Sequence, residues 1–93
     1  MPVETIDVEL PYYFQTDEYG YAKEYIAIRE DLAIIKLHAG STYRSFSIQT
    51  ADVEKVTDLL TEKFSRYKCT TITRQEFDEA LVNLHNSIFK QND

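Results

Sequence analysis

The side chains that could carry chemistry in this 93-residue sequence are two histidines, His38 and His85, and a single cysteine, Cys69. A histidine can act as a general base, and a cysteine that meets a histidine can act as a nucleophile. Both roles need a positioned partner and a pocket, and no spacing in the sequence supplies either. We therefore expect Cys69 to be a structural residue and the protein not to be an enzyme.

Metal and cofactor sites are not expected either. Two histidines and one cysteine at scattered positions match no zinc-binding spacing. With only two glycines, the chain has no glycine-rich loop that could hold a phosphate. A basic-then-apolar leader and a long apolar run are both missing, so we expect a cytoplasmic protein with no membrane segment.

The net charge of −6 is concentrated near the N-terminus. Residues 1–20 hold five acidic and no basic side chains, whereas residues 21–49 hold four basic and three acidic ones. A nucleic-acid-binding protein needs clustered cations to displace the counterions of the phosphates. The charge distribution therefore argues against direct nucleic-acid binding and favours a protein partner with a basic surface.

The elements that would position these side chains begin with a central strand, predicted for Leu32 to Ala39. This apolar run is too short for an ordinary helix and is bounded by turn residues. Alternating segments at 3–10, 21–29 and 43–49 predict further strands, and residues 12–14 form another extended run. The alternation predicts one core face of the sheet, comprising Ile26, Ile28, Ala33, Ile35, Leu37, Ala39, Phe46 and Ile48.

Two amphipathic helices are predicted after the strands. Thr50 is the predicted N-cap of the first. Its apolar stripe comprises Val53, Val56, Leu60, Phe64 and Tyr67. The second begins with a capping box from Thr73 to Glu76, and Ile72 and Phe77 can form the hydrophobic staple around it.

These elements predict an α+β fold in a single domain of residues 1–93. Residues 1–49 would form an antiparallel meander sheet of three to four strands, because their short connections exclude parallel neighbours. Residues 50–90 would form a helical hairpin, with both C-terminal helices packed on one face of the sheet. The other face of the sheet would then be open.

The open face is the first predicted binding surface, since it gathers tyrosine, serine and basic side chains. Tyrosine offers a large contact area at low entropic cost, and serine adapts its hydrogen bonds to a partner. The alternative is that the tyrosines only stabilise the strands. The residues predicted to bind a partner there are Tyr21, Lys23, Tyr25, Arg29, Lys36, His38 and Tyr43, with Ser45 and Ser47 beside them.

Two other surfaces are candidates for partner binding. Asp17 and Glu18 belong to the acidic N-terminal stretch, which either faces a basic groove on another protein or only maintains solubility and protects an edge strand. Val82, His85 and Phe89 form an outer row on the second helix. That row is either a partner surface or a sign that the helix is wedged between its neighbour and the sheet.

We therefore expect a non-enzymatic protein-binding module, such as a small acidic inhibitor that occupies a basic or nucleic-acid-binding surface of its partner. The alternative is a structural subunit of a homo-oligomeric or virion-type assembly. No motif assigns the chain to a family. In size, acidity and expected fold it resembles in general terms many small phage and mobile-element proteins, which include inhibitors of host defence nucleases and virion components; this resemblance assigns no residue.

Overall fold

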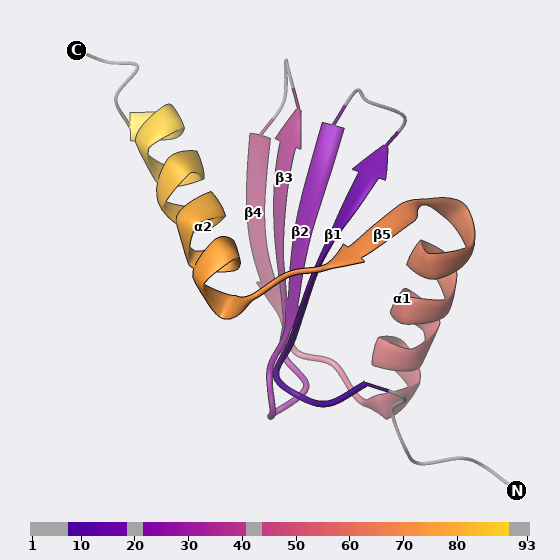
Figure 1. The fold of residues 1–93 in the computed structure, drawn as a ribbon. Helices are drawn as coiled ribbons and strands as arrows, with labels where there is room; N and C mark the ends of the chain where they lie inside the picture. Colours follow the sequence, from indigo (N-terminus) through magenta and orange to yellow (C-terminus); the bar gives the residue numbers. More distant parts are fainter. Residues whose placement is uncertain (1–7, 19–21, 41–43, 90–93) are drawn as a thin grey trace, which may run out of the picture.

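The computed structural model describes residues 8–18, 22–40 and 44–89, apart from the side chains of Glu18 and of residues 87–89. The fold class is α+β, as predicted (Figure 1). The elements in chain order are β1 (Tyr12–Glu18), β2 (Ala22–Ile28), β3 (Ile34–Gly40), β4 (Arg44–Gln49), α1 (Val53–Arg66), β5 (Lys68–Thr71) and α2 (Arg74–Phe89).

The five strands form one antiparallel sheet in the order β4-β3-β2-β1-β5. The prediction of three to four strands missed β5, a four-residue strand between the two helices. Residues 50–90 are therefore not a helical hairpin. Of the strand predicted at 3–10, residues 1–7 lie outside the described residues, and residues 8–10 precede β1 without joining the sheet.

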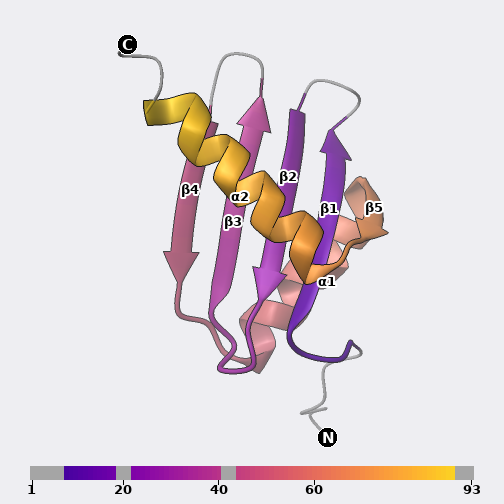
Figure 2. The ribbon, with the colours of Figure 1, turned by 60° about the vertical axis from the view of Figure 1, so that its left-hand side comes forward.

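The two helices cover opposite faces of the sheet, so the prediction that both pack on one face is wrong (Figures 1 and 2). We call these the α1 face and the α2 face. Under α1, Val56, Leu59 and Leu60 pack against Phe14, Ile26, Ile28 and Ile34. Under α2, Phe77 and Leu84 belong to one buried cluster with Ala27, Leu37 and Ile72. Because β5 lies at the edge of the sheet, it carries the chain from one face to the other.

The loop between β2 and β3 sets the register of the central strands. The Leu32 amide donates to the carbonyl oxygen of Arg29 at 2.9 Å, and the Arg29 amide donates to that of Ala33 at 2.9 Å. Leu32 lies in the left-handed region with φ of 70°. This loop pairs Ile28 with Ile34.

The observed register corrects the predicted core face of β3. Ile34 shares the α1 face with Ile28, whereas Ile35 and Leu37 lie on the α2 face opposite Ala27 and Tyr25. The predicted turn at residues 30–31 was too short. A shift of one residue in antiparallel pairing turns every side chain of a strand to the other face.

Both helix starts are capped by side chains. For α2 the predicted capping box is confirmed: the Glu76 amide donates to Thr73 Oγ1 at 3.1 Å, and the Thr73 amide donates to Glu76 Oε1 at 2.9 Å. Ile72 and Phe77, the predicted staple pair, are both buried in the α2-face cluster. For α1 the N-cap is Asp52 instead of Thr50, because its carboxylate accepts the Lys55 amide at 2.8 Å.

Loss of the α2 cap should lower stability. We expect Thr73→Ala to reduce the free energy of unfolding by about 1 kcal/mol, because the Glu76 amide at the helix start loses its acceptor, Thr73 Oγ1. Thr61→Ala, in the exposed interior of α1, is the control and should cause no loss, since alanine favours helix interiors. Chemical denaturation measures both, and equal stabilities would contradict the capping role.

The left-handed conformation of Leu32 gives a second prediction. Glycine adopts positive φ without a Cβ clash, so we expect Leu32→Gly to be more stable than Leu32→Ala by about 1 kcal/mol. Thr57, an exposed position in α1, is the control site. There the glycine variant should be the less stable of the two. If Leu32→Gly were less stable than Leu32→Ala, the loop conformation described above would be wrong.

Candidate functional site

Helix α2 crosses its face of the sheet diagonally, from β1 to β4, and leaves two opposite corners uncovered, one over β3 and β4 and one over β1 and β2 (Figure 2). Near its start, the ring of Phe77 lies 5.6 Å from that of Tyr13 on β1. Two turns later, Leu84 lines a small hollow together with Leu37 of β3 and Arg44 of β4. The helix therefore ends over the Arg44 end of β4, and the Ile48 end of β3 and β4 lacks a helical cover.

A groove of about 560 Å³ occupies this uncovered corner. Its apolar wall includes Ala27, Ile35, Phe46, Ile48, Phe77 and Leu81. Phe46 is 47% exposed and Ile48 is 56% exposed, although both were predicted to be core residues. The groove therefore presents large apolar side chains to solvent, which is typical of surfaces that bind other proteins.

Charged side chains form the rim of the groove. Arg29 pairs with Asp31 at 3.1 Å, and Arg74 pairs with Asp78 at 3.7 Å. Glu30 lines the groove beside them. These ion pairs are exposed and stabilise the fold little. An apolar floor with a polar, solvated rim is the usual anatomy of a protein interface.

The residues predicted to share one open face lie on two faces. Tyr25 and Lys23 are on the α2 face, where Tyr25 is half-buried and packs against the α2 cluster. Arg29 lies at the rim of the groove. Lys36 and His38 are on the α1 face, opposite Ser47 and Ser45 of β4. The predicted tyrosine surface therefore does not exist as a single patch among the described residues.

The other candidate residues are only partly described. Tyr21, Tyr43 and the side chains of Glu18 and Phe89 lie outside the described residues. Asp17 is half-buried on the α2 face and is opposite Lys23 and Lys68.

The outer row of α2 faces solvent at two of its three positions. Val82 is 55% exposed and His85 is also exposed. Helix α1 lies on the other side of the sheet, so α2 is not wedged between that helix and the sheet.

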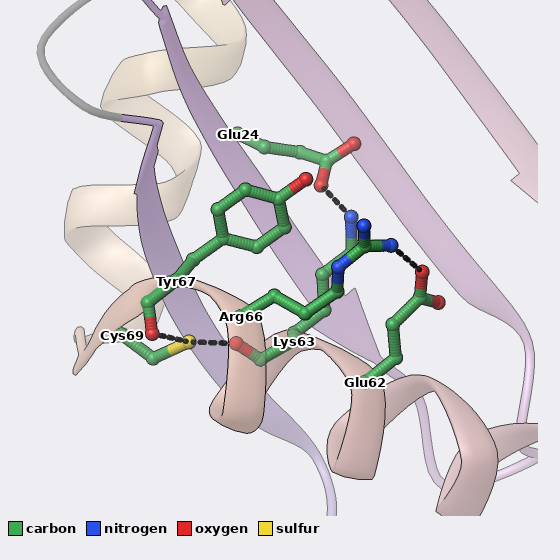
Figure 3. Close-up of polar contacts among 6 residues, drawn as sticks. All are labelled: Glu24, Glu62, Lys63, Arg66, Tyr67 and Cys69. Carbon is green, nitrogen blue, oxygen red and sulfur yellow. Dashed lines mark hydrogen bonds and ion pairs between the residues drawn. The ribbon is translucent and has the colours of Figure 1, made fainter.

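A polar cluster holds the end of α1 to the sheet (Figure 3). Lys63 Nζ lies 2.8 Å from Glu24 Oε1, and these side chains are 14% and 18% exposed. Lys63 Nζ also lies 5.1 Å from the centre of the Tyr67 ring. A hollow of about 180 Å³ beside them is lined by Thr16 and His38 as well. Because Glu24 neutralises the Lys63 ammonium, this cluster does not offer an unpaired cation to an anionic ligand.

Cys69 belongs to the same cluster. Its Sγ lies 3.3 Å from the carbonyl oxygen of Lys63 and 3.6 Å from that of Tyr67, so the thiol proton is directed at the end of α1. Burial raises the pKa of the Cys69 thiol above its ordinary value of 9.0, and the charge of Lys63 partly offsets this effect. A thiol that stays protonated at neutral pH is a poor nucleophile, which supports the structural role expected for Cys69.

Across residues 8–18, 22–40 and 44–89, no cluster of three or more His, Cys, Asp or Glu side chains is arranged to hold a metal ion. Neither helix in this part of the chain is long and apolar enough to cross a membrane. No match was found among protein-family models, curated proteins or solved structures.

The raised pKa of Cys69 predicts a pH-dependent contribution to stability. Between the ordinary thiol pKa of 9.0 and the higher folded value, the unfolded chain loses the thiol proton before the folded chain does. The free energy of unfolding of the unmodified protein should therefore fall relative to that of Cys69→Ser as the pH rises through this window. Denaturation of both proteins across the alkaline range measures the difference, and parallel curves would contradict it.

Proposed function

We propose that this chain is a non-enzymatic protein-binding module and that the groove between α2 and β4 is its binding surface. The observation that carries this proposal is the exposure of Phe46 and Ile48, by 47% and 56%, beside an apolar groove of about 560 Å³. A protein partner would bury these side chains. Adjacent exposed apolar side chains of this size mark interaction surfaces on folded domains. Aromatic residues in the centre of an interface often dominate its affinity.

The charge of the chain supports a partner with a basic surface. Three acidic side chains in the first half of α2, Glu76, Asp78 and Glu79, are exposed. Asp78 lines both the groove and a shallow hollow around Val82. Such a surface suits an inhibitor that occupies a basic or nucleic-acid-binding site, because opposite potentials steer the two proteins together.

Affinity capture from the native host tests the proposed surface. We expect the double variant Phe46→Ala/Ile48→Ala to stay folded, since both side chains are already half exposed. Its binding should weaken by about thirtyfold, which corresponds to the roughly 2 kcal/mol lost when an interface hot spot is truncated. Binding by a basic partner should also weaken as the salt concentration rises.

The matched control is Ser45→Ala/Ser47→Ala, which changes the other face of the same strand. This variant should capture the partner as well as the unmodified chain does. If the groove variant and the control variant capture the same protein equally well, the groove is not the binding surface. The comparison requires the groove variant to be folded, and circular dichroism measures whether it is.

A further inference from the structure

We propose that the partner seated at the groove is a second copy of this chain, joined through antiparallel pairing of β4 with β4. This inference rests on the proposed function, because it names the partner of the same groove; it replaces the basic partner considered above with a second copy of this acidic chain. The two copies would be related by a two-fold axis perpendicular to the sheet, which gives a continuous ten-stranded sheet with both α2 helices on one face. Three observations support this arrangement.

The first observation is the contrast between the two edges of the sheet. Strand β5, at one edge, has four residues, begins with Lys68, and has a helix directly before and after it. Strand β4, at the other edge, has six residues, Arg44 to Gln49, with one charged side chain, Arg44, at its start and no proline, lysine or acidic residue. Soluble proteins usually protect an edge strand by shortening it or adding such residues. The free backbone groups of β4 are therefore suited to pairing with another strand.

The second observation is the diagonal path of α2. The groove lies at the Ile48 end of β4, and α2 ends over the Arg44 end (Figure 2). The proposed two-fold axis places the Arg44 end of each β4 beside the Ile48 end of the other. The end of each α2 is thereby brought next to the groove of the other copy. One short ladder is too small for a stable interface, which buries about 1,000 Å² or more, so this second contact is what the dimer requires.

The third observation is the charge at the two ends of β4. On the α2 face, Arg44 lies at the end of β4 away from the groove, in the same row across the sheet as Lys23 and Asp17. At the opposite end, the groove is lined by Glu30, Asp31 and Asp78 and by Arg29 and Arg74, an excess of one acidic side chain. The same axis brings Arg44 of each copy beside the groove of the other. This contact is complementary in charge, although each chain carries a net charge of −6.

The mass of the full chain in solution tests the proposal directly. We expect sedimentation equilibrium to give twice the 10.9 kDa of one chain. Phe46→Lys should stay folded and give the mass of one chain, because a lysine on the edge strand opposes pairing. Thr61→Lys introduces the same charge at an exposed position of α1, on the other face of the sheet, so it should remain dimeric. A wild-type monomer, or a Phe46→Lys dimer, would overturn the proposal.

Cross-linking tests the register without depending on a destabilising variant. The two-fold axis requires one residue of β4 to lie opposite the same residue of the other copy. The two pairings of this kind that align five of the six residues are centred on Phe46 and on Ser47. In a Cys69→Ser background, either Phe46→Cys or Ser47→Cys should therefore form a disulfide-linked dimer on mild oxidation. Thr61→Cys, on the exposed side of α1, should remain uncross-linked in the same background. Absence of a linked dimer from both β4 variants would rule out this interface.

These results separate the inference from the proposed function. If the chain is monomeric but the Phe46→Ala/Ile48→Ala variant still loses a captured protein, the groove binds a different partner and only the self-pairing is wrong. If the chain is monomeric and capture is unaffected by that variant, both proposals fail.

Discussion

The register between β2 and β3 is the constraint on which both faces of this protein depend. It is set by the loop from Arg29 to Ala33, in which Leu32 adopts positive φ. With one residue fewer in this loop, Ile35 and Leu37 would turn towards α1, and Lys36 and His38 would turn towards α2. The observed loop instead gives each helix an apolar surface, and the cost of a left-handed leucine is offset by two buried clusters.

The sequence predicts most elements but not how they are layered. The strands near residues 22–28, 34–40 and 44–49 and the start of α2 follow from alternation and capping, which are local signals. The faces of the central strands do not. Ile26-Ala27-Ile28 and Ile34-Ile35 are apolar at consecutive positions because these strands are buried on both sides, so alternation cannot orient them. Strand β5 is only four residues long and has no hydrophobic alternation of its own, so its sequence indicates only a connection between the helices.

The groove was missed for a related reason. Alternation in β4 places Phe46 and Ile48 on one face, and that much of the prediction agrees with their pairing to Leu37 and Ile35. Whether such a face is covered depends on the position of the strand in the sheet and on the angle at which a helix crosses it. Both are properties of the tertiary arrangement. An edge strand under the end of a diagonal helix leaves apolar side chains exposed, even though its sequence pattern is that of a core strand.

The α1 face contributes mainly to stability, whereas the α2 face carries the proposed binding surface. The α1 face combines a large apolar cluster with the Lys63–Glu24 ion pair, and both hold α1 to the sheet. On the α2 face, the smaller cluster stops short of β4. Burial of exposed apolar surface contributes roughly 25 cal/mol per Å², and a domain of this size buries a smaller share of its surface than a larger one. A partner at the groove would therefore stabilise the fold by the same contacts that give it affinity, which couples association to folding.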